Sequence, residues 1–196
     1  MLVLENSIIN SAFWHKKKVL ITGHTGFKGS WLSLWLHKLG AEVFGLALDP
    51  LTQPSLFVRA NVAKQMTSIH GDICDLATVK KVFADVQADI VIHLAAQSLV
   101  RYSYQNPIET YQTNVMGTLN VLEAIRECGS VRAAVMVTTD KCYENKEWIW
   151  GYREEEPMGG YDPYSSSKGC AELVSSAYRR SFMQEQGVGL ATARAG

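Results

Sequence analysis

A tyrosine and a lysine four residues apart, Tyr164 and Lys168, could together remove a proton from a substrate hydroxyl. They open a segment that keeps helical spacing to about Gln186, and a spacing of four places both side chains on one face of a helix. A free phenol has a pKa of about 10, so it is a useful base at neutral pH only where a cation favours its ionised form. Lys168 is placed to supply that cation. Such a pair also occurs on ordinary helix surfaces, so other residues must support the interpretation.

A second group of polar residues, Thr139, Asp140 and Lys141, follows an apolar segment from Val131 to Thr138 that is typical of a buried strand. Open α/β sheets bind their ligands at the carboxyl ends of their strands. Thr139 is therefore expected to bind substrate, by a hydrogen bond to the hydroxyl that the tyrosine deprotonates. Asp140 and Lys141 add two ionisable side chains at the same edge.

A glycine-rich turn provides the cofactor side of the same predicted site. Gly23, Gly26 and Gly29 recur every third residue after the apolar run Val19 to Ile21, and helical spacing begins directly afterwards. A strand that leads into a helix N-terminus in this way presents free N–H groups to a diphosphate. The glycines alone fit a tight turn equally well. Asp49, about twenty residues further on, adds the acid that accepts hydrogen bonds from the adenosine ribose.

The spacing Gly-x-x-Gly-x-x-Gly resembles that of the extended short-chain dehydrogenase/reductase family, whose members bind NAD or NADP in this turn. Asp49 would repel a 2′-phosphate, so the expected cofactor is NAD. Asp72, after the predicted third strand, either accepts from the adenine amino group, as its family counterpart does, or organises the following loop. Lys28 either reaches the diphosphate or lies exposed on the first helical turn.

The resemblance also assigns residues along the whole predicted site. Lys168 is expected to hold the nicotinamide ribose, and Ser98 matches a family position near the sugar hydroxyls, which makes it a candidate for substrate binding. The residues expected to contact the cofactor are Gly23, Thr25, Gly26, Phe27, Lys28, Gly29, Asp49, Asp72, Ile73, Leu94, Ala95, Ala96, Thr113, Tyr164 and Lys168.

The nucleotide-sugar 4,6-dehydratases of this family carry Thr-Asp-Glu where this chain has Thr139, Asp140 and Lys141. Their aspartate protonates the leaving C6 hydroxyl, and their glutamate removes the C5 proton. The resemblance covers nearly the whole chain and is carried by four segments, which are Gly23 to Leu32, Ala95 to Ser103, Thr113 to Thr118 and Thr139 to Lys168. It points to members that act on CDP-glucose. It implies transient C4 oxidation with bound NAD, loss of water across C5 and C6 and hydride return to C6, in deoxysugar and O-antigen biosynthesis.

Lysine at position 141 changes the expected C5 base. A free lysine, with a pKa of about 10.4, needs its pKa lowered by more than three units, or about 4.6 kcal/mol, to act as a base at neutral pH. Burial beside Lys168 would lower the pKa of Lys141. A lysine that keeps its charge would instead stabilise the enolate while another group takes the proton. A third interpretation pairs Lys141 with Glu144 or another acid on the surface.

Strands that alternate with helices predict an α/β fold with a doubly wound parallel sheet, the Rossmann fold. The predicted strands are Val19 to Ile21, Glu42 to Leu48, Thr67 to His70, Ile90 to Leu94, Val131 to Thr138 and a sixth that ends before Ala193. Long helices are expected at Thr110 to Cys128 and Tyr164 to Gln186, and a short one at Ser55 to Ala63. His93 lies inside a buried apolar run, which favours a core role over a catalytic one.

We expect residues 1–16 to be a leader and residues 17–196 to be an NAD-binding domain, truncated before a C-terminal substrate domain. Such a fragment should show little turnover. The nineteen basic and nineteen acidic residues cancel, which argues against nucleic acid or an anionic membrane as the partner. No run reaches membrane-spanning length and no signal peptide is visible, so a cytoplasmic protein is expected. The four cysteines are widely spaced, so we expect reduced thiols and no metal site.

Two other functions share part of this pattern. A nucleotide-sugar epimerase or reductase needs the glycine turn, Thr139, Tyr164 and Lys168, but it does not need Asp140. An NAD-binding regulatory module needs only the turn, and the complete set of proton-transfer residues argues against it. Relatives usually form homodimers through the two long helices, so a homodimer is expected.

Overall fold

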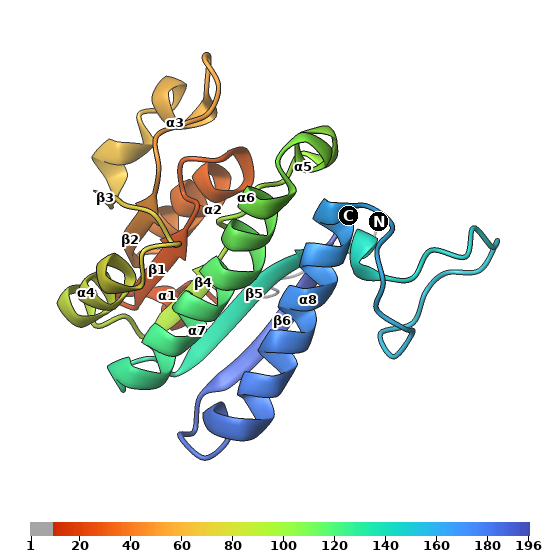
Figure 1. Ribbon diagram of the computed structural model, residues 1–196. Coiled ribbons are helices and arrows are strands. Elements are labelled where there is room, and N and C mark those ends of the chain that lie inside the picture. The colour runs from red at the N-terminus through yellow and green to blue at the C-terminus, as the bar shows by residue number, and fades with distance from the viewer. Residues whose placement is uncertain (1–9) are drawn as a thin grey trace, which may run out of the picture.

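Residues 10–196, which the computed structural model describes, form a parallel sheet of six strands between two layers of helices (Figure 1). The strands are β1 (Lys18–Thr22), β2 (Glu42–Ala47), β3 (Thr67–His70), β4 (Ile90–His93), β5 (Ala133–Thr139) and β6 (Gly189–Ala195). Their order in the sheet is β3-β2-β1-β4-β5-β6, which confirms the predicted doubly wound α/β fold. The order reverses between β1 and β4, and ligands of such sheets bind beyond the carboxyl ends of the strands at that point.

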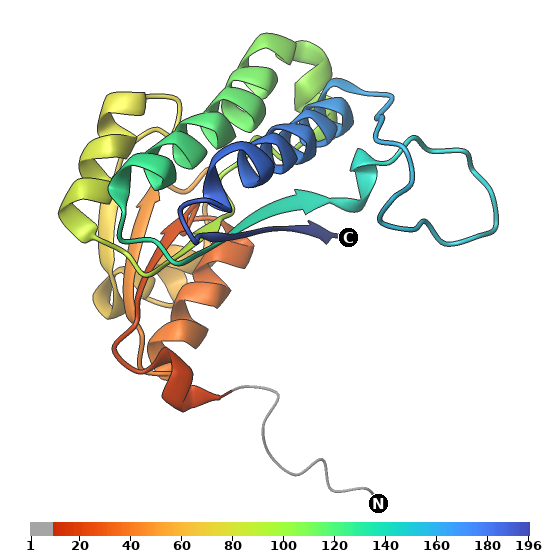
Figure 2. The ribbon, with the colours of Figure 1, turned by 90° about the horizontal axis from the view of Figure 1, so that it is seen from below.

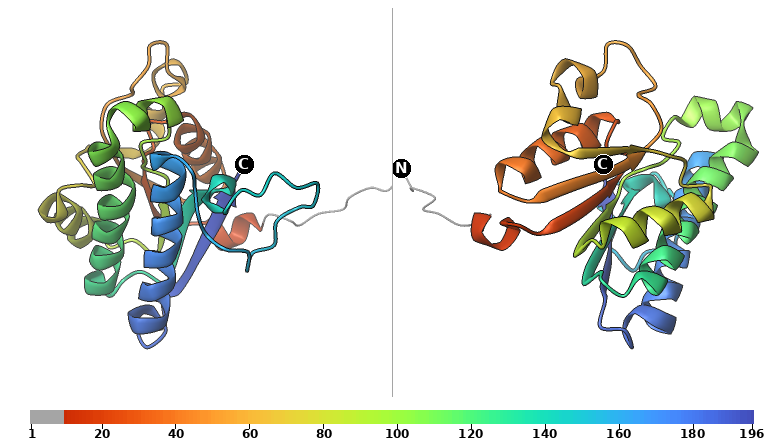
Figure 3. Two further views of the ribbon diagram at one scale, coloured as in Figure 1. Left: turned by 45° about the vertical axis from the view of Figure 1, so that its right-hand side comes forward. Right: turned by 90° about the vertical axis from the view of Figure 1, so that its left-hand side faces the viewer.

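Helices cover both faces of the sheet, so the central strands are apolar on both sides (Figure 2, Figure 3). Leu20 of β1 faces the larger core, under α4 (Leu76–Val86), α7 (Gly117–Cys128) and α8 (Pro163–Tyr178). Val19 and Ile21 face the smaller core, under α2 (Phe27–Lys38). The remaining helices are α1 (Ser11–Trp14), α3 (Leu56–Arg59), α5 (Val100–Gln105) and α6 (Pro107–Tyr111).

The structure divides the long helices that the sequence predicts. Instead of one helix from Thr110 to Cys128, a π-helical turn at Gln112–Met116 separates α6 from α7. The predicted helix Tyr164 to Gln186 ends as α8 at Tyr178, and a second π-helical turn, Arg179–Met183, follows it. Hydrophobic spacing of about 3.6 residues does not distinguish an α-helix from one that contains a single wider turn.

Smaller differences concern the ends of elements. β5 reaches Thr139, one residue beyond the prediction, because Thr139 pairs with Ala195 of β6. β6 therefore also includes Ala193, which was expected to follow it. The short helix predicted from Ser55 is α3, and a 3-10 turn at Val62–Gln65 comes after it. Of the predicted leader, residues 1–9 lie outside the described residues, and α1 starts beyond Asn10, which caps it.

None of the helices formed by residues 10–196 combines the length and the apolar character needed to span a bilayer. The four cysteines, Cys74, Cys128, Cys142 and Cys170, are free thiols.

Two buried histidines connect segments that are distant in the sequence. His93, at the end of β4, is 2% exposed, with its Nδ1 2.6 Å from the Thr22 hydroxyl and its Nε2 3.0 Å from the Thr118 hydroxyl. This confirms that it is a core residue with both ring nitrogens paired. His24, in the glycine turn, contacts Ser68 of β3 through Nε2 at 2.7 Å. Burial lowers the pKa of His24 to about 4 and that of His93 to about 3.

Stability should therefore fall as the pH drops below 6.5. The unfolded histidines bind protons at a pKa of 6.5, whereas the folded ones stay neutral down to about 4 and about 3. Their contribution to stability is complete above pH 6.5 and is lost as the pH falls from 6.5 towards those lower values. At about pH 5 the loss is about 2 kcal/mol for each histidine. Urea unfolding of this chain, compared between about pH 7.5 and about pH 5, measures it.

The control separates these histidines from general acid effects. A His93→Gln variant should lose about half of the pH dependence, whereas His37→Asn, which changes an exposed histidine, should keep it. An unchanged pH dependence in His93→Gln would contradict the assignment.

Candidate active site

The glycine turn packs so tightly that two of its glycines are required by the protein itself. Gly23 has φ +77°, and a Cβ there would lie 2.6 Å from the backbone nitrogen of Ala95. A Cβ on Gly29 would collide with the carbonyl oxygen of Gly23. Gly26 differs, because its φ is −73° and a Cβ would meet only the Gly23 carbonyl oxygen, at 3.4 Å. The open side at Gly26, where α2 begins, leaves room for a ligand at the helix N-terminus.

The other predicted residues of the turn surround this opening. The Thr25 hydroxyl donates to the Leu48 carbonyl oxygen at 2.9 Å, which ties the turn to the end of β2. Phe27 and Lys28 are exposed on the first turn of α2. For Lys28 both positions considered from the sequence remain compatible with the structure, because an exposed lysine there can also reach a diphosphate.

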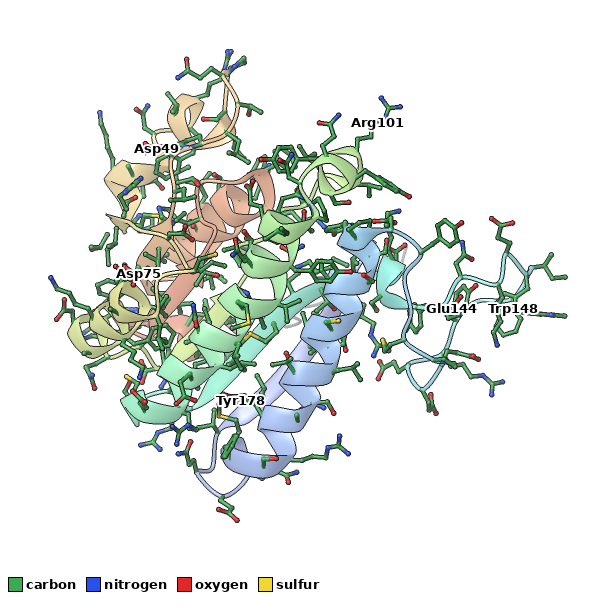
Figure 4. All side chains as sticks on the ribbon, viewed as in Figure 1. Asp49, Asp75, Arg101, Glu144, Trp148 and Tyr178 are labelled. Atoms are coloured by element: carbon green, nitrogen blue, oxygen red, sulfur yellow. The ribbon has the colours of Figure 1, made fainter. Side chains whose placement is uncertain are left out.

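Two aspartates follow the outer strands on the side of the turn where an adenosine would lie. Asp49 is almost fully exposed beyond β2, with its carboxylate 3.8 Å from His70 (Figure 4). The Asp72 carboxylate accepts from the Cys74 backbone N–H at 2.8 Å, so it organises its loop. It is Asp75 that caps α4, by accepting from the Ala77 N–H at 3.0 Å. Asp49 and Asp72 each keep an exposed carboxylate that can accept further hydrogen bonds.

The segment after β4 forms the floor of the site next to the turn. Leu94 donates its N–H to the Thr22 carbonyl oxygen at 3.0 Å, and the Ala95 N–H points to the Thr22 hydroxyl at 3.3 Å. These bonds hold Leu94, Ala95 and Ala96 beside the glycines. Ser98, the predicted substrate residue, lies exposed a little further on. The hydroxyl of Thr113 lies 3.9 Å from the Cys74 sulfur, and Ile73 packs its side chain into the core.

The proton-transfer residues meet at the carboxyl end of β5. Thr139, Tyr164 and Lys168 are 6%, 8% and 5% exposed, and they come from β5 and the first two turns of α8. Tyr164 is fixed at the start of α8, where its N–H donates to the buried Ser103 hydroxyl at 3.2 Å. Lys168 donates to the Val137 carbonyl oxygen at 3.2 Å. The structure therefore brings Thr139 to the start of the helix that carries Tyr164 and Lys168, more than twenty positions further along the sequence.

The electrostatics of this group differ from the sequence prediction. Burial raises the pKa of Tyr164, and the Thr139 hydroxyl is the neighbour that acts against this rise. Lys168 is not among the groups that lower the pKa of the phenol, contrary to the prediction. Burial lowers the pKa of Lys168 itself to about 8, and the Glu172 carboxylate opposes that fall. The reason for the difference is that both side chains lose water, which disfavours the charged form of each.

Asp140 and Lys141 stand on the 3-10 turn Asp140–Cys142, which follows β5 directly. The Asp140 carboxylate accepts from the Thr139 hydroxyl at 3.0 Å. Lys141 is exposed, which contradicts the hypothesis that burial beside Lys168 turns it into a base. Within residues 10–196 it also forms no ion pair with Glu144. Its exposure and its lack of an acidic partner within these residues leave the interpretation in which Lys141 stabilises the enolate.

Next to this turn lies a hollow of about 590 Å³. Its lining includes Asp140 and Lys141 together with three tyrosines, Tyr143, Tyr152 and Tyr161. The rings of Tyr143 and Tyr152 stack with their centroids 5.1 Å apart. The hollow therefore combines the two residues expected to take part in water elimination, Asp140 and Lys141, with aromatic side chains.

Two buried residues that hold the site in place, Asn114 and Ser103, are absent from the predicted site residues. Asn114, in the π-helical turn, is fully buried, and its side chain accepts from the Gln97 N–H at 2.8 Å and donates to the Gln97 carbonyl oxygen at 2.9 Å. It also donates to the Ser167 hydroxyl at 2.9 Å. It thus joins the segment after β4 to α8. The signals available for Asn114 and Ser103 were the segments Thr113 to Thr118 and Ala95 to Ser103, which carry the family resemblance.

The fold and the site together define a class of enzyme, and comparison with known proteins agrees. The chain belongs to the GDP-mannose 4,6-dehydratase family, whose model matches residues 20–189. It is 57% identical over 194 residues to the CDP-glucose 4,6-dehydratase of Salmonella typhimurium, covering 96% of this chain and 54% of that one. It is 33% identical over 180 residues to a GDP-mannose 4,6-dehydratase of Vibrio cholerae, covering 86% and 47%. The resemblance to nucleotide-sugar 4,6-dehydratases is thereby confirmed.

Solved structures agree on the fold. The epimerase Mth375 of Methanothermobacter thermautotrophicus matches with a TM-score of 0.81 and 27% identity, over 94% of this chain and 52% of that one. MoeE5, in complex with UDP-glucose and NAD, matches with a TM-score of 0.73 and 25% identity, over 90% and 53%. The chain spans about half the length of the relatives it matches.

An Asn114→Leu variant should unfold at a lower temperature. It removes three hydrogen bonds and leaves the buried polar groups of Gln97 and Ser167 without their partner, at a cost of about 2–4 kcal/mol. For a chain of this size each kcal/mol lowers Tm by about 2–4 °C. Circular dichroism during heating measures the change. Gln105→Leu, which removes an exposed amide, should leave Tm nearly unchanged, and an equal effect of the two variants would contradict this role.

Proposed function

We propose that these residues form the cofactor and proton-transfer part of a nucleotide-sugar 4,6-dehydratase that converts CDP-glucose to CDP-4-keto-6-deoxyglucose. The observation that carries the proposal is the meeting of Thr139, Tyr164 and Lys168 at the carboxyl end of β5, with Asp140 and Lys141 on the next turn. The 57% identity to a CDP-glucose 4,6-dehydratase supports CDP-glucose as the substrate. Because the chain spans about half of that relative, the activity is proposed for the whole protein, and residues 1–196 alone should turn over little.

NAD is the cofactor that the residues fit best. Gly26 has no steric need to be glycine within the protein, and its open side faces the start of α2, where a diphosphate would be held by backbone N–H groups. Asp49 and Asp72 keep exposed carboxylates for the adenosine, and Lys168 would hold the nicotinamide ribose. Bound in this place, NAD supplies a reversible acceptor for a hydride.

The remaining chemistry belongs to the side chains of this chain. Tyr164 takes the proton of the substrate C4 hydroxyl, while Thr139 holds that hydroxyl by a hydrogen bond. Because burial raises the pKa of Tyr164, its ionised form binds a proton strongly and can take the proton of the substrate hydroxyl. Asp140 protonates the leaving C6 hydroxyl. A base other than Lys141 accepts the C5 proton, and the Lys141 ammonium stabilises the enolate that this leaves.

We also propose a cytoplasmic homodimer that supplies 4-keto-6-deoxy sugars for O-antigen synthesis. The dimer is supported by an apolar surface over α6, the π-helical turn and α8. It holds a hollow of about 530 Å³, lined by Pro107, Ile108, Tyr111, Gln112, Val115, Met116 and Cys170. Ile108 is 74% exposed and Leu173 of α8 is 59% exposed, so an apolar partner would remove them from water. Four free thiols are compatible with a reducing compartment.

Replacing Asp140 with Asn should stop water loss in the whole protein. The amide cannot donate the proton that the C6 hydroxyl needs, so formation of the 4-keto-6-deoxy product should fall about 100-fold or more. The measurement is NMR of the product after incubation with NAD and CDP-glucose, with UDP-, GDP- and dTDP-glucose in parallel. Asp85→Asn, an exposed aspartate of α4, is the control and should keep full activity.

The same assay distinguishes the alternatives. An epimerase or reductase would keep its activity in Asp140→Asn and would form no 6-deoxy product. A wild-type protein that binds NAD but converts none of these sugars would instead indicate an NAD-binding regulatory module.

A charge placed on the apolar surface should separate the dimer. Leu173→Glu should sediment as a monomer, because burying an unpaired carboxylate in an interface is costly. Val58→Glu alters an equally exposed apolar residue of α3, at 61% exposure, and should leave the dimer intact. Analytical ultracentrifugation distinguishes the two. A wild-type protein that sediments as a monomer, or a dimer that persists in Leu173→Glu, would contradict this interface.

A further inference from the structure

Glu172 is a buried carboxylate with three partners from the sheet. It lies in α8, one turn beyond Lys168, and is 6% exposed. It accepts hydrogen bonds from the Thr138 hydroxyl, from the Thr192 hydroxyl at 3.0 Å and from Nη2 of Arg194 at 3.1 Å. A buried charge is tolerated only when it is paired and hydrogen-bonded in this way. The arrangement therefore fixes the Arg194 side chain at the end of β6.

The other side of the Arg194 guanidinium points away from the sheet. Its Nη1 donates to the Tyr143 hydroxyl at 2.6 Å and to the Glu154 carbonyl oxygen at 2.9 Å. Its central carbon lies 4.8 Å from the centroid of the Tyr143 ring. One side chain thus holds Tyr143, directly before the segment 144–161, and Glu154 within that segment. The segment extends from the domain between β5 and α8 and carries Glu144 and Trp148 (Figure 4).

Tyr143 is the residue that ends the turn carrying Asp140 and Lys141. Its N–H lies 3.4 Å from the Asp140 carbonyl oxygen, and it forms an antiparallel bridge with Met158. Its ring also stacks on Tyr152. Any movement of Tyr143 would therefore move the C-terminal end of this turn.

We propose that Arg194 is a positioning residue for water elimination: held by Glu172, it fixes Tyr143 and so presents Asp140 and Lys141 to the substrate. The inference rests on the proposed dehydratase function. Arg194 touches no reacting atom. Tyr164 and Lys168 have their own anchors, the Ser103 hydroxyl and the Val137 carbonyl oxygen, so the oxidation step does not depend on this contact.

The experiment compares two steps in the whole protein. In Tyr143→Phe, which keeps the ring and the pair of Glu172 with Arg194, product formation from CDP-glucose should slow about 100-fold, because small displacements of catalytic groups have effects of that size. The absorbance rise that reports C4 oxidation in a single turnover should keep its rate within about threefold. Arg194→Met should show the same separation, and Arg194→Lys should recover part of the elimination rate.

Two controls and a second measurement accompany these variants. Thr192→Val removes another donor to Glu172, one that does not reach Tyr143. Arg180→Met removes an exposed arginine. Both variants should retain the rate of elimination. In residues 1–196 alone, trypsin should cleave after Lys146 and Arg153 faster in Arg194→Met and in Tyr143→Phe than in the unchanged chain. This measurement needs no turnover and detects release of the segment even if one variant folds poorly.

The outcomes separate this inference from the proposed function. Equal slowing of oxidation and elimination in Tyr143→Phe, or no change in either step, would overturn the positioning role. Unchanged trypsin cleavage in both variants would overturn the contact itself. A wild-type protein that forms no 4-keto-6-deoxy product would contradict the proposed function and would leave the cleavage result as a separate test of the contact.

Discussion

The close packing of the glycine turn against the segment after β4 is the constraint on which the site depends. Gly23 has no room for a side chain beside Ala95, and Gly29 has none beside Gly23. The Thr22 hydroxyl, at the end of β1, contacts the Ala95 N–H in the segment after β4 and also the ring of His93. These contacts hold the carboxyl ends of β1 and β4 together, at the point where the strand order reverses. The N-terminus of α2 and the floor beside it are therefore parts of one rigid edge.

Buried charge is the second feature that organises the site. Lys168 and Glu172 lie one turn apart on α8, both nearly inaccessible to water. Burial weakens the proton affinity of the lysine, and the carboxylate partly restores it. The same carboxylate fixes Arg194 at the end of β6. One buried acid thus acts on both Lys168 and Arg194, and its full set of hydrogen bonds explains why the protein tolerates it.

The catalytic turn contrasts with this rigid interior. Asp140 and Lys141 are exposed on a short 3-10 turn, and their orientation depends on residues before and after it. Thr139 anchors the turn to β5, and Tyr143 anchors it to the outlying segment. The residues proposed for hydride exchange are therefore built into the sheet and α8, whereas those proposed for loss of water are held by contacts between loops.

The sequence alone determined the order of strands and helices, the glycine turn and the helix start that carries both Tyr164 and Lys168, because these follow from local spacing and residue type. It also identified His93 as a core residue, since an apolar run on both sides leaves no route to a ligand. Only the tertiary structure decided the burial of each charge. In the folded chain Lys141 is exposed, burial raises the pKa of Tyr164, and Arg194 lies beside Tyr143. Desolvation and contacts across fifty residues depend on how distant segments pack, and neither has a signature in local sequence.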